Sequence, residues 1–359
     1  MLETFFIYDL MLFISIILVF FAEIAKVIKL KHVFFILALL PLFLVSALRE
    51  NTGADYSHYV DIYNNLDYYN ENWPLEIGFY YLNKLYMLFG LHHQFIFVTM
   101  AAIQCLFLYL CLTKSKCPSL FLVSYILLFY LSSLNEMRQS LSMVMILYAC
   151  FLLFENKYMK YILLVGLSSL FHNVSFLFFP LILLRFFPVS RIAMMVVIFL
   201  CYFVLSFNII DLVLELNILS GTKYQGYLSM DEYARETNIG SGLGMIFQYF
   251  ILLPFIFLRK DRFVTEKYNI VLLINIFVLL SLFISIKFYI FNRILSAFSI
   301  ALILSVELLV DSRFKLNKII LFLCFSFWVV LYHKDILDSN KEFGKNKQIS
   351  PYSSIFHYN

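Results

Sequence analysis

The chain has 359 residues, of which 62% are apolar and only 14% are charged. Because soluble domains carry about 25% charged residues, this composition argues against an ordinary soluble protein. The net charge of +4 is too small to indicate a nucleic-acid partner, and in a membrane protein it reflects loop orientation. The six cysteines are scattered without metal-binding spacing, so we expect no metal site and no cofactor.

Apolar stretches near the length that crosses about 30 Å of hydrocarbon recur along the whole chain. They are continuous and do not alternate with polar residues, which favours helices over a β-barrel. We therefore predict an all-α, polytopic integral membrane protein with about 12 transmembrane helices plus interfacial half-helices. The expected crossings are residues 5–22, 33–48, 94–112, 119–134, 137–154, 160–173, 174–187, 191–207, 244–258, 268–285, 289–310 and 318–333.

Residues 76–90 are too short and too polar for a crossing, so we expect a half-helix at the membrane interface. If this segment does not cross, the Lys- and Arg-rich connections all fall on one side, which the positive-inside rule makes cytoplasmic. Residues 1–334 then form a single transmembrane domain in the cytoplasmic (inner) membrane. The loops 49–93 and 208–243 and the tail 335–359 lie on the periplasmic or extracellular side.

Polar side chains gather at the outer ends of the predicted crossings, on the side where basic residues are normally scarce. Polar and ionisable groups at membrane depth are costly and usually line a cavity or pair with one another. We therefore treat this set as a candidate site facing the outer aqueous phase. Its members are Arg49, Asp55, Glu76, Asn135, Arg138, Gln139, His172, Asn292 and Arg293.

A structural interpretation stays open for several of these residues. An arginine at a helix end is often a snorkelling anchor, and a lone histidine such as His172 is often a satisfied core residue. Asp55 can serve simply as the partner of Arg49. Tyr56 and Tyr59 match the aromatic belt of a membrane interface, although tyrosines also make platforms for sugar rings.

Several arginines beside a carboxylate and a histidine suit the chemistry of a diphosphate leaving group. Guanidinium groups bind phosphate oxygens in pairs, and they stabilise the negative charge that develops as a diphosphate departs. A carboxylate or imidazole can take the proton from an attacking hydroxyl. A sugar donor linked through diphosphate to a lipid, with its tail in the bilayer and its head outside, fits this layout.

Short motifs along the chain resemble those of the EpsG-type (Wzy-like) polymerases of bacterial surface polysaccharides. They are "RENTGADYSHY" at 49–59, "EIGF" at 76–79, "RQS" at 138–140, "FHNVS" at 171–175, "FNR" at 291–293 and "PY" at 351–352. Each motif is weak alone, but the ordered set covers nearly the whole chain.

The resemblance implies a polymerase that joins undecaprenyl-diphosphate-linked oligosaccharide repeat units into O-antigen, capsule or exopolysaccharide. Arg138 and Arg293 would bind the donor diphosphate with Arg49 in support, and either Asp55 or His172 would be the general base. Glu76 would position acceptor hydroxyls. Other residues expected at the substrate are Tyr56, Tyr59, Asn135, Gln139 and Asn292. The implied partners are the lipid-linked repeat units and the bilayer, with a chain-length regulator and a flippase of the same pathway as candidates.

Three other activities are alternatives. A lipid-linked oligosaccharide flippase or transporter is expected to show internal repeats or charges near the bilayer midplane, and the sequence shows neither clearly. A membrane acyltransferase would take its acyl donor from the cytoplasm and needs polar features on that face. An O-antigen ligase shares most of the chemistry, so the sequence barely separates it from a polymerase.

Overall fold

The computed structural model describes residues 2–184, 266–287, 291–310, 315–339 and 347–356, with a few isolated positions between 196 and 251. Within these ranges the chain is all-helical, because the structure contains no strand there and only one isolated bridge, between Arg49 and Ser354. The all-α part of the predicted fold class is therefore confirmed for the described residues.

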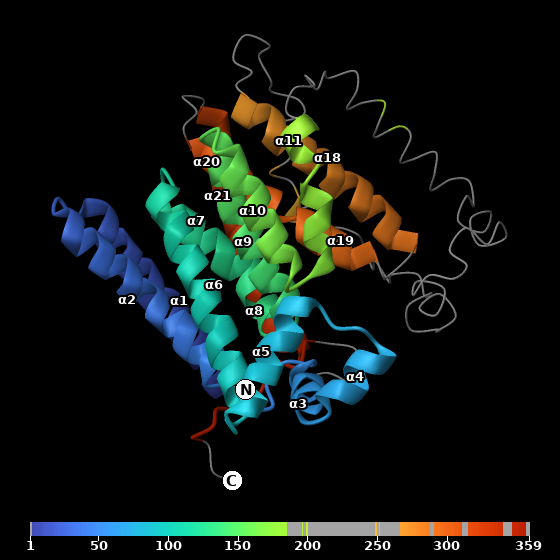
Figure 1. Cartoon of the computed structure of the whole chain (residues 1–359). Helices are drawn as coiled ribbons and strands as arrows, with labels where there is room; N and C mark the ends of the chain where they lie inside the picture. The colour runs from blue at the N-terminus through green and yellow to red at the C-terminus, as the bar shows by residue number, and fades with distance from the viewer. Residues whose placement is uncertain are drawn as a thin grey trace.

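The first half of the chain forms helices α1 to α9 (Figure 1). Their bounds are α1 Leu2–Ile24, α2 Ile28–Ala47, α3 Tyr56–Asn64, α4 Leu66–Asn72, α5 Ile77–Leu88, α6 Gln94–Lys114, α7 Pro118–Tyr125, α8 Leu131–Ser133 and α9 Met137–Phe154. A π-helix, Ile126–Tyr130, joins α7 to α8. The described remainder comprises α10 Tyr158–Ser169, a 3₁₀ helix Asn173–Phe178, α11 Leu181–Leu184, α18 Glu266–Lys287, α19 Asn292–Phe298, α20 Ile300–Val310 and α21 Lys315–Asp338.

Seven helices in the described part of the chain are long and apolar enough to cross a bilayer, which makes this a multi-pass membrane protein. Each coincides with one of the expected crossings, but the predicted total of about 12 is not confirmed. The expected crossing 119–134 corresponds to a shorter apolar stretch, Pro118–Ser133. The expected crossings 191–207 and 244–258 and the loop 208–243 lie outside the described residues.

The expected crossings 160–173 and 174–187 differ most from the structure. Helix α10 has 12 residues, about 18 Å at 1.5 Å per residue, which is short of the roughly 30 Å of hydrocarbon. The chain turns at His172, whose backbone is extended, and continues as the 3₁₀ helix and the four-residue α11. Continuous apolar sequence concealed this turn.

The long helices form a bundle in which α1 packs on α2 and α7, α6 packs on α2 and α9, and α10 packs on α9. Helices α3, α4 and α5 lie together at one end of this bundle, close to both chain termini (Figure 1). We call this the α3–α5 end. The connections between α1 and α2, α6 and α7, and α9 and α10 lie at the opposite end.

Two buried or half-buried carboxylates hold the start of α7 at that opposite end. Glu307 Oε2 accepts the backbone N–H of Lys116 at 3.0 Å, and Glu23 Oε1 accepts the backbone N–H of Ser119 at 2.7 Å. The first N–H groups of a helix have no partner within the helix. These contacts from α1 and α20 therefore satisfy the start of α7 and tie three segments together.

The loop that follows α2 is fixed by the guanidinium of Arg49, which is 1% exposed. Nη1 donates to the carbonyl oxygen of Leu134, and Cζ lies 5.1 Å from the ring centroid of Phe97. Gln94 Nε2 donates to the carbonyl oxygens of Ala47 and Arg49 at 2.7 and 3.1 Å. The end of α2, the start of α6 and the turn before α9 are thereby held together.

Hydrogen bonds attach the C-terminal tail to the same loop. The backbone N–H groups of Glu50, Gly53 and Ile355 donate across the two segments, to Ser353 at 2.9 Å, Gln348 at 2.8 Å and Leu48 at 3.0 Å respectively. The hydroxyl of Tyr352 reaches the carbonyl oxygen of Val45 at 3.0 Å. Residues 347–355 therefore form part of the framework of the α3–α5 end.

Gly53 is required where this loop meets the turn before α9. Its φ is +100°, and a Cβ would press on the carbonyl oxygen of Leu134 and lie 3.4 Å from Nη1 of Arg49. Gly90 also has positive φ, +62°, but no atom lies within 4 Å of its Cβ position. Both glycines have positive φ, but Gly53 is crowded and its φ also lies outside the left-handed region of about +50 to +70° that other residues adopt.

We expect Gly53→Ala to lower the free energy of unfolding by clearly more than Gly90→Ala. Both changes carry the cost of positive φ, about 1–2 kcal/mol, while crowding at position 53 adds about 1–3 kcal/mol. Thermal unfolding of the two purified variants in detergent measures the difference. Equal losses for the two variants would show that the contact between Gly53 and Leu134 is not tight.

Candidate functional site

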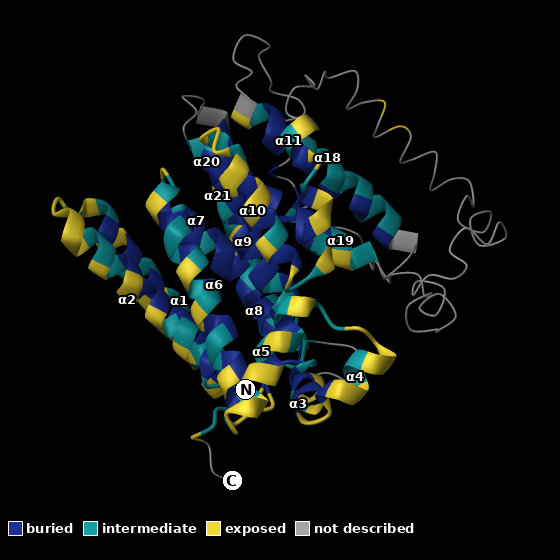
Figure 2. Cartoon of the chain, in the orientation of Figure 1, coloured by how far each residue is buried: buried dark blue, intermediate teal, exposed yellow. Residues whose placement is uncertain are grey.

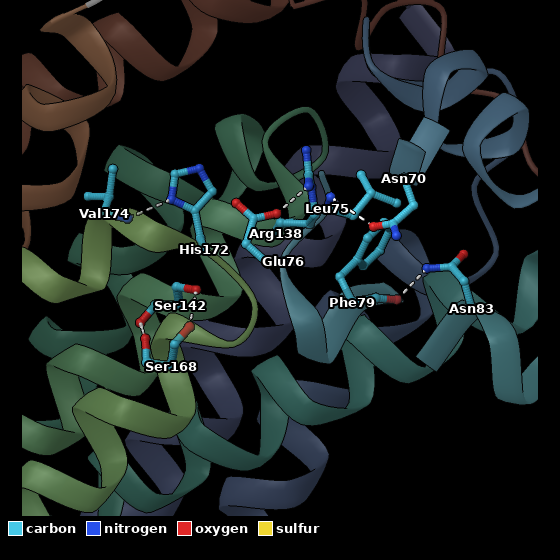
Figure 3. A network of polar contacts seen from close by, with 10 residues as sticks. All are labelled: Asn70, Leu75, Glu76, Phe79, Asn83, Arg138, Ser142, Ser168, His172 and Val174. Carbon is cyan, nitrogen blue, oxygen red and sulfur yellow. Dashed lines mark hydrogen bonds and ion pairs between the residues drawn. The ribbon is translucent and has the colours of Figure 1, made fainter. Parts of the chain in front are cut away.

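An ion pair between Arg138 and Glu76 forms the centre of the candidate site (Figure 3). Nη1 of Arg138 lies 2.5 Å from Oε2 of Glu76, and the two side chains are 21% and 12% exposed. Arg138 comes from the first turn of α9, whereas Glu76 immediately precedes α5. The guanidinium also lies over the rings of Phe79 and Tyr59, 5.1 and 5.8 Å from their centroids. The sequence prediction had placed both charges at one surface, and the structure brings them into direct contact.

Tyr56 and Tyr59 pack inward instead of facing outward, Tyr59 against the guanidinium of Arg138 and Tyr56 against Phe97. Both are buried. Tyr56 stacks on Phe97 with centroids 4.6 Å apart and donates to Gln94 Oε1 at 3.2 Å. Burial raises the pKa of Tyr56 to about 12, so the phenol stays neutral. Neither ring is exposed enough to serve as an open platform in this structure.

Asp55 occupies the N-cap position of α3, but its side chain makes no capping hydrogen bond. Its backbone N–H donates to Asn135 Oδ1 at 2.9 Å, which ties α3 to the turn before α9. Burial raises the pKa of the Asp55 carboxyl, while the nearby charges of His58, Arg293 and Arg138 act in the opposite direction. A carboxylate that is not used as a cap is left to face these cationic groups.

Glu136 and His58, which are not among the residues predicted from the sequence, join this cluster. Burial raises the pKa of Glu136; Lys347 and Arg293 oppose this shift, and Asp55 adds to it. Burial lowers the pKa of His58, and Asp55 opposes that shift. Asp55 and Glu136 therefore form a pair of neighbouring carboxyl groups surrounded by cations.

Two signals in the sequence point to these residues. Glu136 lies two residues before the "RQS" motif that begins with Arg138, and His58 follows Asp55 by three residues, about one helical turn. Neither signal says that the two motifs meet, because residues 55 and 136 are joined only by the fold.

His172 lies in the turn between α10 and the 3₁₀ helix, where its Nδ1 accepts the backbone N–H of Val174 at 3.3 Å. The carbonyl oxygen of Leu170 accepts the backbone N–H of Gly78 at 2.8 Å, which places this turn against the start of α5. Figure 3 shows the imidazole on the side of Glu76 that faces away from Arg138. His172 therefore belongs to the periphery of the ion pair.

Three serines close to His172 in the fold have a structural role. Ser168 and Ser175 are buried, and their hydroxyl oxygens are 2.7 Å apart. Ser142 and Ser168 each donate to the other's carbonyl oxygen at 3.0 Å (Figure 3). These contacts join α9, α10 and the 3₁₀ helix beneath the site.

Asn292 and Arg293 start α19, and Gln139 of α9 donates from Nε2 to the carbonyl oxygen of Arg293 at 2.7 Å. Gln139 is buried, Asn292 is half-buried and Arg293 is exposed. The effect of Arg293 on both Asp55 and Glu136 places its guanidinium on the same side of the bundle as these carboxyl groups. Arg293 is therefore the exposed cation of the cluster, whereas Arg138 is the enclosed one.

No group of three or more His, Cys, Asp or Glu side chains within the described ranges is placed to hold a metal ion. These residues can bind anions through their cationic groups, transfer protons through carboxyl or imidazole groups, and form hydrogen bonds through their amides.

A comparison with protein families matches the EpsG family model to residues 32–354. The match begins within α2 and extends through α21 into the tail that pairs with the Arg49 loop. The chain belongs to the EpsG family. No curated protein and no solved structure matches the chain. Membership of this family points to polysaccharide biosynthesis. The matched range, residues 32–354, includes every candidate residue named above.

The ion pair makes a testable contribution to stability. We expect Glu76→Gln and Arg138→Gln each to lower the free energy of unfolding, and the double variant to lose about 1–3 kcal/mol less than the sum, because removing one partner leaves the other charge partly buried. Thermal unfolding of the three variants gives the coupling energy.

The exposed pair Lys157 and Glu155, also 2.5 Å apart, is the matched control. Its coupling should stay below about 1 kcal/mol because water screens it. Equal couplings for the two pairs would contradict the enclosed environment described for Arg138.

Proposed function

We propose that the protein is a membrane-embedded polysaccharide polymerase of the glycosyltransferase type. It would join undecaprenyl-diphosphate-linked oligosaccharide repeat units at the outer face of the cytoplasmic membrane. The observation that carries this proposal is the meeting of Arg138, Glu76 and Asp55 at the α3–α5 end, the end opposite to the connections that carry Lys26, Lys116 and Lys157. Such a cluster combines anion binding with a proton acceptor.

In this proposal Arg138 and Arg293 bind the donor diphosphate. Arg138 is held in place by Glu76 and by the rings of Phe79 and Tyr59. Its Nε–H is buried and has no hydrogen-bond partner among the described residues. Buried donors without a partner are uncommon in proteins, and binding a phosphate group at this guanidinium gives a reason for one. Arg49 supports the loop from below: its Nη1 and Nη2 contact Leu134 and Met137 and its guanidinium lies over Phe97, although its Nε also has no hydrogen-bond partner among the described residues.

Asp55 is the proposed general base. An acceptor hydroxyl attacks the anomeric carbon of the donor sugar, the bond from that carbon to the diphosphate oxygen breaks, and the diphosphate leaves with the electron pair. The proton of the hydroxyl passes to the Asp55 carboxylate. The raised pKa of Asp55 suits this step, because a general base works best when its pKa approaches the operating pH. His172 is the alternative base, although its Nδ1 already accepts from Val174.

Glu76 and the amides complete the proposed site. The second carboxylate oxygen of Glu76, with Asn135 and Asn292 at the neighbouring helix starts, would orient acceptor hydroxyls. Gln139 acts through the backbone of Arg293, because its amide donates to that carbonyl oxygen. Gln139 is therefore a positioning residue.

Deleting the gene and resolving the surface glycan on a gel tests the function. A polymerase predicts a product with a single repeat unit. A surface without any repeat unit would indicate the flippase or transporter, and polymer that is made but not attached would indicate the ligase. An acylation defect with normal chain length would indicate the acyltransferase.

Restoring the deletion strain with Arg138→Ala should leave single capped repeats and abolish long chains, because the donor diphosphate loses its enclosed cation. Removing one such charge contact typically slows a reaction by about 10²–10³-fold. Lys157→Ala, at the opposite end of the bundle, is the control and should restore normal chains at equal protein level. Normal chain lengths with Arg138→Ala would refute the diphosphate role.

The raised pKa of Asp55 predicts an acid limb in the pH profile of polymerisation by the purified enzyme. Activity should rise with pH as Asp55 loses its proton, through a range above the ordinary aspartate value of about 3.9. Asp55→Asn should reduce the rate by about 10²–10⁴-fold, while Asp61→Asn on the exposed side of α3 should leave the profile unchanged. If the acid limb instead persists in Asp55→Asn and disappears in His172→Asn, the base is the imidazole.

A further inference from the structure

An exposed group of aromatic rings on α4 lies outside the site described so far. Tyr68 and Trp73 are 59% and 60% exposed, and Tyr69 is half-buried beside them. The ring centroid of Trp73 lies 6.2 Å from that of Tyr68 and 6.0 Å from that of Tyr69. Figure 2 shows exposed surface along α3 and α4 at this end of the bundle. We call Tyr68, Tyr69 and Trp73 the α4 aromatic cluster.

Hydrogen bonds hold this cluster in a defined shape. Asn72 Nδ2 donates to the carbonyl oxygen of Tyr68 at 2.9 Å. Asn70 Oδ1 accepts the backbone N–H of Leu75 at 3.2 Å, which fixes the turn after Trp73 (Figure 3). Ordered aromatic rings at a surface mark binding sites more often than isolated exposed residues do.

The charges around the cluster disfavour an anionic lipid surface as its occupant. Between Arg49 and Lys84 the chain contains no lysine or arginine, whereas Asp61, Asp67 and Glu71 are exposed. Segments that bind anionic lipid headgroups carry lysine and arginine beside their aromatic residues. The side chain of Lys84 contacts Tyr80, because Nζ donates a hydrogen bond to the Tyr80 hydroxyl at 2.9 Å.

We propose that the α4 aromatic cluster binds the sugar rings of the glycan that reaches the candidate site. One face of a pyranose ring presents C–H groups and its rim presents hydroxyls. A large, rigid aromatic ring covers the C–H face, while amides and carboxylates such as those of Asn70, Glu71 and Asp67 accept or donate to the rim. An uncharged sugar is compatible with an acidic surface that repels phosphate.

The cluster is continuous with the proposed base. The ring of Tyr69 meets the ring of His58 edge-on with centroids 5.5 Å apart, and His58 follows Asp55 by three residues on α3. The charges of His58 and Asp55 affect each other's pKa, which places them close together. A glycan lying on α4 would therefore extend toward Asp55 and Arg138. This inference rests on the proposed function and adds to it a sugar-binding subsite.

The chain contains only two tryptophans, Trp73 and Trp328, and Trp328 is fully buried. Fluorescence of the full-length protein in nanodiscs therefore reports the cluster directly. The probe is the lipid-free surface polysaccharide of the producing strain, released by mild acid. We expect it to protect Trp73 from acrylamide quenching in the wild-type protein and in Trp328→Phe, and to have no effect in Trp73→Phe.

Two further variants separate the cluster from exposed aromatic residues in general. Tyr68→Ala should weaken the polysaccharide affinity at least tenfold, while Tyr81→Ala on α5, equally exposed, should leave it within twofold. Protection that is absent in the wild-type protein and in Trp328→Phe would overturn the inference. Strong quenching of Trp73 by brominated lipids, without protection by polysaccharide, would overturn it in favour of a membrane contact.

The test is separable from that of the proposed function. In a strain where deletion abolishes long chains, Trp73→Ala combined with Tyr68→Ala should shorten the chains without eliminating polymer, at equal protein level. Unchanged chain lengths together with unchanged polysaccharide binding would refute the sugar-binding subsite without contradicting the proposed polymerase function. A deletion strain with normal surface glycan would instead refute the polymerase, whatever the binding assay shows.

Discussion

The buried guanidinium of Arg49 is the contact on which the α3–α5 end depends. No carboxylate among the described residues forms an ion pair with it; the Leu134 carbonyl oxygen and the face of Phe97 surround it instead. Hydrogen bonds that replace water reduce the cost of burying a charge, and Arg49 has them at Nη1 and Nη2 but not at Nε among the described residues. Because Leu134 precedes α9 and Phe97 belongs to α6, a single side chain fixes three segments that are far apart in sequence. The bridge from the Arg49 backbone to Ser354 adds the C-terminal tail to the same junction.

The candidate site follows from that junction. Because Arg49 fixes the loop that follows α2, Asp55 in that loop lies against the turn before α9, where Asn135 accepts its backbone N–H. The same turn starts the helix that carries Arg138, so a carboxylate from one motif meets a guanidinium from another. Burial then acts on both carboxyl groups of the cluster in one direction, raising the pKa of Asp55 and of Glu136. The nearby cations act against that shift.

The sequence predicts part of this arrangement. Long apolar runs identify the seven long helices, because hydrocarbon thickness imposes a minimum length. Loop charges place Arg49, Arg138 and Arg293 at one end. The turn at His172 is concealed, since apolar residues continue through it. The sequence also does not distinguish Arg49, which is fully buried, from Arg138, which is paired with Glu76. That difference depends on residues that only the fold brings together. Tyr56 and Tyr59 show the same limit: their spacing fits either a surface or a buried face, and the structure buries both, Tyr59 against Arg138 and Tyr56 against Phe97.

The proposed substrate has a diphosphate part and a sugar part, which need different surroundings. Helix α3 lies between a region that suits the diphosphate and a region that suits the sugars. A departing diphosphate requires cations in a partly dry site, which Arg138 supplies beneath Glu76. A sugar chain requires open aromatic faces and polar groups in water, which α4 supplies through Tyr68 and Trp73. The acidic residues between Arg49 and Lys84 disfavour phosphate on the α4 side and do not oppose uncharged sugars. Under the proposed function, charge would therefore orient the substrate before any specific contact forms, with its phosphates toward α9 and its sugars toward α4. Asp55, at the start of α3, lies between the two.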